Sequence, residues 1–169
     1  IFFNQGESCN APSRLFVEAS IKDRFLEKAL KLVPGYMPAN PTLPATVMGA
    51  VVDKMQLETV LRYIDSGKSE GARLIAGGEQ ALTETGGCYV QPTIFDGVTP
   101  EMTIAREEIF GPVLSVMSFT DTAEVVRMAN SRSGEGFIAI SPEARKKFWL
   151  DRKKTAAISR HTNAFKVNE

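Results

Sequence analysis

The first part of the chain alternates between extended and helical patterns of apolar residues. An apolar run flanked by charged residues at 14–18 predicts a short strand. In the segment that follows, apolar residues recur at helical spacing and predict a helix that Ser20 caps and that ends at Pro34-Gly35. The residues on its apolar face are Ile21, Phe25, Ala29, Leu30 and Val33. Three prolines within 38–44 then indicate a loop.

A second helix is predicted to begin at Asp53, a residue type favoured at helix N-caps, and to end at Gly67. Its apolar positions lie near helical spacing and are Met55, Leu57, Val60, Leu61 and Ile64. After this helix, the apolar run 72–76 precedes two glycines and predicts a buried strand.

Two more apolar segments, 89–95 and 113–119, continue this alternation as predicted strands. The next helix is expected to begin at Asp121, because an Asp followed three residues later by Glu124 has the spacing of a capping box. The order of strands and helices predicts an α/β fold with layers, in which helices flank a mostly parallel sheet.

The pattern changes after residue 130, and we expect three parts. Residues 1–130 form the α/β body, the short polar stretch 131–136 is a linker, and 137–169 is an unrelated basic tail. Ser141-Pro142 has the residue types typical of a helix start and predicts a basic helix that runs to about Ile158. The charges agree with a division: residues 1–136 carry 12 Lys/Arg and 17 Asp/Glu, whereas 137–169 carry 8 and 3.

The composition is that of a soluble globular protein, with 43% hydrophobic and 24% charged residues in 169. No apolar run approaches the length that crosses a bilayer, so we expect no membrane partner and a cytoplasmic location. The basic tail lacks interleaved aromatic residues, which argues against nucleic acid. Cys9 and Cys88 form no C-x-x-C pair, so neither a disulfide framework nor a metal site is indicated.

The strongest chemical signal is Cys9, which follows a glycine-bearing turn in the sequence Phe-Phe-Asn-Gln-Gly-Glu-Ser-Cys-Asn-Ala. A thiol can act as a nucleophile when its surroundings favour the thiolate or supply a base. No His, Lys or Arg precedes Cys9, so such a base must come from elsewhere in the fold or from residues that this chain does not contain. Without its flanking residues, a lone cysteine is more often a small buried apolar residue, and Cys88 keeps that interpretation.

The segment around Cys9 resembles the nucleophile segment of the NAD(P)-dependent aldehyde dehydrogenases. A second block agrees, Pro-Thr-Ile-Phe at 92–95 followed by Ile-Ala-Arg-Glu-Glu-Ile-Phe-Gly-Pro-Val at 104–113. The resemblance covers residues 1 to about 130, and within the family it is greatest to enzymes of amino-aldehydes. The tail 137–169 shows a fainter resemblance to flavin-linked lactate or glycolate oxidases.

The resemblance implies that Cys9 attacks a small-molecule aldehyde to form a thiohemiacetal, whose oxyanion the Cys9 backbone N–H and an asparagine amide would stabilise. Hydride transfer to NAD or NADP and hydrolysis of the thioester would give a carboxylate. Glu108 matches the residue that hydrogen-bonds the nicotinamide ribose, and Phe110 matches the ring beside it. The family's general-base glutamate, oxyanion asparagine and cofactor fold match nothing in this chain, so we expect a piece of an enzyme, inactive alone.

Other interpretations remain open. The chain could be a non-catalytic folded remnant that forms homo-oligomers or binds a protein through exposed apolar surface. A flavoprotein role would rest on the tail alone. Glu107 and Glu108 could be an ordinary acidic pair on a loop, and Phe110 could belong to the core.

Overall fold

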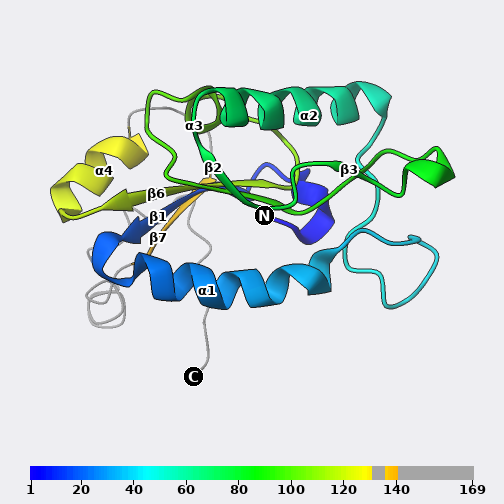
Figure 1. Cartoon of the computed structure of the whole chain (residues 1–169), viewed down its shortest axis with the longest axis horizontal. Coiled ribbons are helices and arrows are strands. Elements are labelled where there is room, and N and C mark those ends of the chain that lie inside the picture. Colours follow the sequence, from blue (N-terminus) through cyan, green and yellow to red (C-terminus); the bar gives the residue numbers. More distant parts are fainter. Residues whose placement is uncertain (131–135, 141–169) are drawn as a thin grey trace.

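The computed structural model describes residues 1–130 and 136–140, and these form a five-stranded sheet between helices (Figure 1). The strand order is β2-β5-β6-β1-β7. All neighbouring pairs are parallel except β2 and β5, which are antiparallel. The predicted α/β fold with a mostly parallel sheet is therefore confirmed. The strands are β1 (Pro12–Glu18), β2 (Arg73–Ala76), β5 (Thr93–Asp96), β6 (Val113–Phe119) and β7 (Gly136–Ile140).

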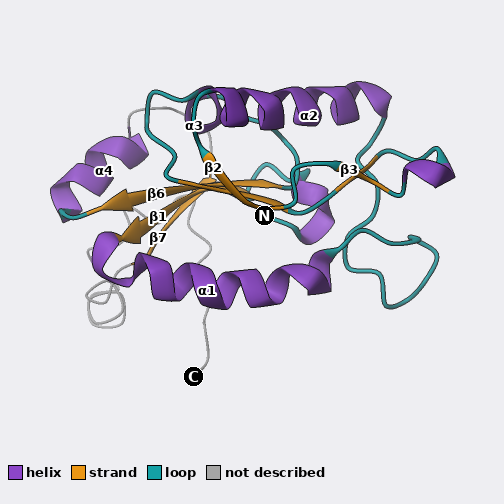
Figure 2. Cartoon of the chain, viewed as in Figure 1, coloured by secondary structure: helices purple, strands orange, loops and turns teal. Residues whose placement is uncertain are grey.

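Helices cover both faces of this sheet (Figures 1 and 2). Helix α1 (Lys22–Leu32) lies on one face, and α2 (Lys54–Ser69) with the short α3 (Thr103–Arg106) lies on the other. Helix α4 (Thr122–Asn130) contributes to the same core as α2. A small antiparallel sheet joins β3 (Gln80–Ala81) and β4 (Tyr89–Val90). Short 3₁₀ helices are η1 (Phe3–Gly6), η2 (Ala19–Ile21), η3 (Val33–Tyr36) and η4 (Thr83–Thr85).

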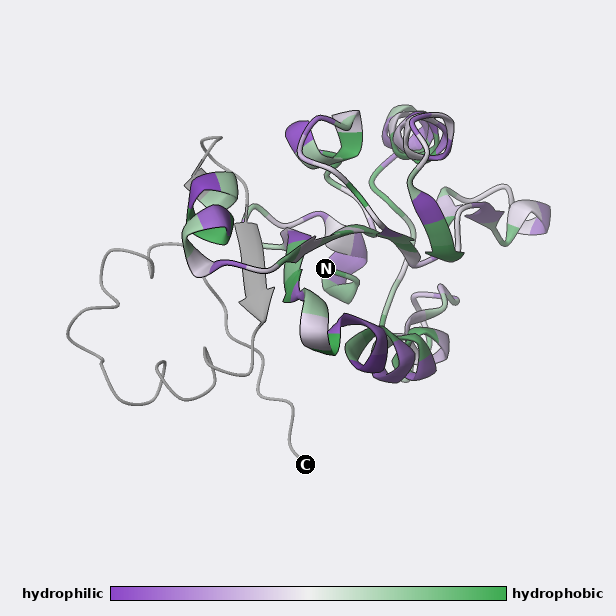
Figure 3. Cartoon of the chain, turned by 60° about the vertical axis from the view of Figure 1, so that its left-hand side comes forward, coloured by the Kyte–Doolittle hydropathy of each residue, from purple (hydrophilic) through white to green (hydrophobic). Residues whose placement is uncertain are grey.

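The alternation of side chains along each strand divides the interior into two cores. Phe16 and Phe95 point toward α2, whereas Leu15, Val17 and Ile94 belong to the cluster that packs against α1. Because both faces of the central strands are covered, these strands read as continuous apolar runs, and Figure 3 colours much of the sheet as hydrophobic.

The ends of two helices differ in part from the prediction. Asp53 is confirmed as the N-cap of α2, because its side chain accepts a hydrogen bond from the Gln56 N–H. Ser20 is not the cap of the first helix: it lies in η2, and α1 follows from Lys22 without a side-chain cap. Gly67 does not end α2, which continues to Ser69. Gly67 is buried instead, and a Cβ there would lie 2.9 Å from Ile104 Cδ1.

The strand predictions also needed correction. The segment 72–76 forms β2, but as an edge strand with half-buried and exposed residues, so the predicted burial was wrong. The segment 89–95 is split between β4 and β5. No strand was predicted at 136–140, where β7 pairs with β1, although those residues had been assigned to the linker and the tail. The three-part domain division stays a prediction, and the predicted tail helix lies outside the described residues.

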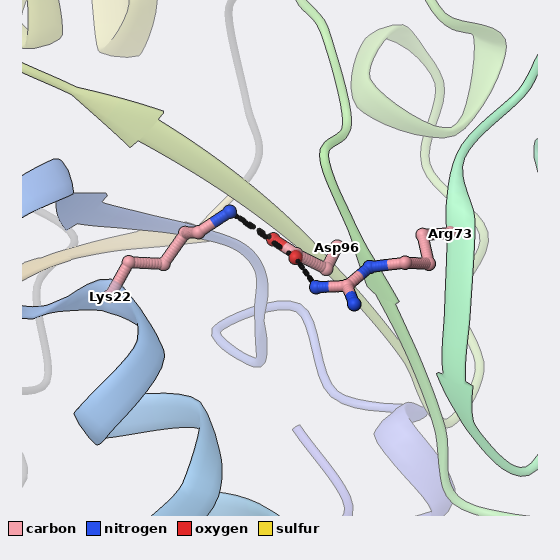
Figure 4. A network of polar contacts seen from close by, with 3 residues as sticks. All are labelled: Lys22, Arg73 and Asp96. Carbon is pink, nitrogen blue, oxygen red and sulfur yellow. Dashed lines mark hydrogen bonds and ion pairs between the residues drawn. The ribbon is translucent and has the colours of Figure 1, made fainter.

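A buried carboxylate links three elements at one end of β5. Asp96 is 2% exposed and receives Lys22 Nζ, from the first residue of α1, at 3.1 Å. Arg73, the first residue of β2, forms the second ion pair with it (Figure 4). Burial by itself raises the pKa of Asp96, but hydrogen bonds from Arg73, Lys22 and the Gly97 backbone outweigh it, so the pKa lies below its ordinary value.

Replacing this carboxylate should lower stability in a pH-dependent way. We expect Asp96→Asn to reduce the free energy of unfolding by about 2 kcal/mol at pH 7, because charge-assisted hydrogen bonds to a buried group are lost. Since the folded pKa is depressed, the wild-type advantage is complete above the unfolded pKa of about 3.9 and disappears as the pH falls through the folded value. Urea unfolding monitored by circular dichroism across the acid range measures this difference.

Glu58→Gln is the matched control, because Glu58 forms an exposed pair with Lys54 at 3.8 Å and should change stability little. A difference between Asp96→Asn and wild type that stays constant from neutral to strongly acid pH would contradict the role given to this carboxylate.

Candidate active site

Cys9 lies exposed in the turn between η1 and β1, after a stretch of unusual backbone. Asn4, Gln5 and Gly6 all have left-handed conformations, with φ of 52°, 55° and 74°. For residues other than glycine this conformation costs on the order of 1 kcal/mol or more each, so surrounding contacts must maintain it. Within the turn, the Asn4 amide donates to the Glu7 carbonyl at 3.0 Å, and the Glu7 N–H donates to the Asn4 carbonyl at 2.9 Å.

The segment that leads into α2 anchors this turn. The Val52 N–H donates to the Glu7 carboxylate at 3.0 Å, and the Gly49 N–H donates to the Gln5 side-chain oxygen at 3.3 Å. Both acceptors come from the residues just before Cys9. The position of the thiol is therefore tied to the start of α2.

A second loop, residues 107–112, carries the other predicted site residues and is attached to the same helix. The Gln56 side-chain amide donates to the carbonyl oxygens of Ile109 at 3.0 Å and Phe110 at 2.9 Å. The Tyr63 hydroxyl donates to the Glu107 carboxylate at 2.9 Å. Helix α2 thus contacts both loops.

Two glycines allow the loops to touch each other. A Cβ on Gly6 would lie 2.1 Å from the Gly111 carbonyl oxygen, and its φ of 74° also favours glycine. A Cβ on Gly111 would lie 2.5 Å from Val60 Cγ2. The turn that carries Cys9 therefore packs backbone to backbone on the second loop, and the second loop packs on α2.

Between the loops is a small open hollow. Ser8, Cys9 and Ser13 line it from one side, and Glu108, Phe110 and Gly111 line it from the other. The structure thus brings together Cys9, Glu108 and Phe110, the three residues that the sequence singled out, while their roles stay predictions. Phe110 is 37% exposed and Cys9 is exposed, so neither is sealed in the core. Cys88 lies elsewhere, half-buried against the larger core cluster.

The chemistry of the hollow suits a polar ligand with hydroxyl groups. Glu108 is exposed, and no residue in the described part of the chain hydrogen-bonds its carboxylate, so both oxygens are available to accept. A carboxylate can accept two hydrogen bonds from a ribose diol. Phe110 has a left-handed φ of 54° and is partly open to solvent, and it lines the same hollow as Glu108. Glu108 therefore has the acceptors that a ribose would need.

Some features of the site were not found from the sequence. Gln56 was not singled out from the sequence, and Gly6 and Gly111 appeared only as parts of motifs; a glycine pair in two separate motifs was the one available signal. Among residues 1–130 and 136–140, no cluster of His, Cys, Asp and Glu could bind a metal ion. Within those same residues, no helix is long and apolar enough to span a membrane.

Comparison with solved structures finds proteins with the same fold over most of this chain. The aldehyde dehydrogenase KauB from Pseudomonas aeruginosa is 60% identical, with a TM-score of 0.76, over 77% of this chain. The indole-3-acetaldehyde dehydrogenase AldA from P. syringae, solved with NAD⁺ and IAA, is 58% identical with a TM-score of 0.76 over 77%. The gamma-glutamyl-gamma-aminobutyraldehyde dehydrogenase from Burkholderia cenocepacia is 54% identical with a TM-score of 0.74 over 77%.

The chain spans 26% of the length of each of these three structures and a similar share of curated relatives. The family model described as "Aldehyde dehydrogenase family" matches residues 1–136, which include both loops of the hollow and the strands that support them. The chain therefore belongs to the aldehyde dehydrogenase family.

Proposed function

We propose that Cys9 is the nucleophile of an NAD(P)-dependent oxidation of an aldehyde to a carboxylate, with Glu108 and Phe110 on the nicotinamide side of the site. The observation that carries this proposal is the single hollow lined by all three residues. Homologues bind NAD⁺, as the AldA complex illustrates. A cytoplasmic location is part of the proposal and agrees with Cys9 and Cys88 both being free thiols.

The residues of this chain suit the covalent steps. The Cys9 thiolate would form a bond with the carbonyl carbon, and the electron pair of the C=O bond would move to oxygen to give the thiohemiacetal. The Cys9 backbone N–H would donate to that oxyanion. NAD(P) would accept the hydride, and water would then cleave the thioester and release the carboxylate. Glu108 would orient the nicotinamide ribose, and Phe110 would limit its movement.

For the substrate, we propose an amino-aldehyde. The sequence resembles enzymes of this class, and the Burkholderia cenocepacia homologue, which is 54% identical, is named for gamma-glutamyl-gamma-aminobutyraldehyde. Homologues named for other substrates are about as similar in sequence: AldA, which is 58% identical to this chain, is named for indole-3-acetaldehyde. A comparison of these two aldehydes therefore discriminates within the family.

Cys9 should be the more reactive thiol and should react reversibly with aldehyde. We expect iodoacetamide to alkylate Cys9 about tenfold faster than Cys88, because Cys9 is exposed in the hollow and Cys88 is half-buried. An amino-aldehyde should slow labelling of Cys9 more than indole-3-acetaldehyde does, and should leave Cys88 unaffected. Mass spectrometry of the intact chain and its peptides gives both rates.

In the control Cys9→Ser, only the slow labelling of Cys88 should remain. Faster labelling of Cys88 than of Cys9, or equal protection of both thiols by aldehyde, would argue against Cys9 as the nucleophile.

The isolated chain should not catalyse oxidation of the aldehyde. A general base contributes roughly 10²–10⁴-fold and one oxyanion donor roughly 10²–10³-fold. Because the family's general-base glutamate and oxyanion asparagine match no residue of this chain by resemblance, we expect no NADH above the Cys9→Ser control. Spectrophotometric assay of NADH with the amino-aldehyde measures this, and NADH formation that depends on Cys9 would overturn the expectation of inactivity.

A second candidate function is association through apolar surface. Phe3, Val52 and Met55 are 77%, 76% and 73% exposed, and Val52 contacts the turn that carries Cys9. Exposed apolar side chains mark a contact surface when they form one contiguous patch, and this proposal requires that these three residues do so. If the chain self-associates through them, sedimentation velocity should show a concentration-dependent dimer that Met55→Glu weakens and that the exposed-site control Glu58→Gln retains. A monomer at all concentrations would exclude homo-oligomers of this kind.

A further inference from the structure

One stripe of α2 faces the loop that carries Glu108 and Phe110. Gln56, Val60 and Tyr63 are spaced by four and three residues, which places them on the same side of a helix. Each contacts the loop: Gln56 through two carbonyl oxygens, Val60 through close packing on Gly111, and Tyr63 through the Glu107 carboxylate. Lys54 and Glu58, elsewhere on α2, pair with each other within the helix, and Lys68 near its end donates to the Gly78 carbonyl oxygen at 3.1 Å.

Phe110 has a backbone conformation that needs support from outside the loop. Its φ is 54°, a region that residues with a Cβ rarely adopt and that costs on the order of a few kcal/mol at most in comparable sites. Its carbonyl oxygen accepts a hydrogen bond from Gln56 at 2.9 Å, and the preceding carbonyl, of Ile109, accepts the other at 3.0 Å. One side-chain amide therefore fixes two consecutive peptide groups at the residue whose backbone is strained.

The start of α2 is itself fixed relative to the Cys9 turn. Asp53 caps the helix by accepting from the Gln56 N–H at 2.8 Å, and the adjacent Val52 N–H donates to Glu7. Gln56 therefore belongs to the same turn of chain that anchors the nucleophile side of the hollow. Both loops that line the hollow are therefore attached to the start of α2.

We propose that Gln56 is a positioning residue, which sets the placement of Glu108 and Phe110 relative to Cys9 by donating to the Ile109 and Phe110 carbonyl oxygens. This inference rests on the proposed function for its catalytic meaning, because it concerns the same three residues. Removal of the two side-chain N–H groups of Gln56 should therefore change the spacing across the hollow and leave the stability of the fold nearly unchanged.

The first test is backbone amide hydrogen exchange in Gln56→Met, which keeps the length of the side chain and removes both donors. Loss of two hydrogen bonds should raise the exchange rate of amides in the 107–111 loop by roughly tenfold or more. Amides of β5 and β6 should exchange as in wild type. Glu58→Gln, on the same helix, is the control and should change neither set.

The second test measures the spacing across the hollow. In a Cys88→Ala background, Glu108→Cys supplies a thiol opposite Cys9, and bismaleimides of increasing span are used to cross-link the two. With Gln56 present, we expect one span to dominate. With Gln56→Met the product should spread over several spans, while the urea midpoint stays close to that of the parent.

These outcomes separate positioning from a purely structural role. An unchanged distribution of cross-links, or equal acceleration of exchange in the loop and in β5 and β6, would overturn the proposal. Gln56→Glu, which also lacks the amide donors, provides the same comparison if Gln56→Met does not fold. Because neither measurement uses an aldehyde or NAD⁺, each can succeed when aldehyde protection of Cys9 fails, so the two proposals fail independently.

Discussion

The contact of Gly6 with Gly111 is the constraint on which the rest of the site depends. The two backbones approach so closely that a Cβ at Gly6 would lie 2.1 Å from the Gly111 carbonyl oxygen. This contact joins the turn before Cys9 to the loop after Glu108, and Val60 of α2 packs closely against Gly111. No side chain can occupy the space between the loops at this point. Both glycines also line the hollow, so the contact forms part of its wall.

The framework that carries these loops could be predicted well from the sequence where patterns are local and strong. β6 and the cap of α2 at Asp53 follow directly from an apolar run and a capping residue. Gly67 misled the prediction because glycine usually ends helices, whereas here the lack of a side chain admits the ends of Ile104 and Phe95. Which strand lies at an edge, as β2 does, depends on pairing with distant residues and leaves no local signal.

The candidate site shows the same division. Cys9, Glu108 and Phe110 could be singled out because each lies in a long motif with a family resemblance. Gln56 could not, because its partners are more than fifty residues away and a glutamine near a helix start has an ordinary local explanation. The strand β7 could not be predicted for a related reason. It pairs with β1, which is distant in sequence, and the residues just before it have the composition of a linker.

The register of β1 has a consequence for how such a chain acquires its structure. Arg14 pairs with Ser115 and Pro12 with Gly136, so the strand that follows the thiol finds its two neighbours only after roughly a hundred further residues have been synthesised. Local helices such as α1 can form early, but closure of so long a loop is entropically slow. Pairing of β1 with its neighbours, and with it the fixed placement of the Cys9 thiol opposite the second loop, is therefore expected to be a late event of folding.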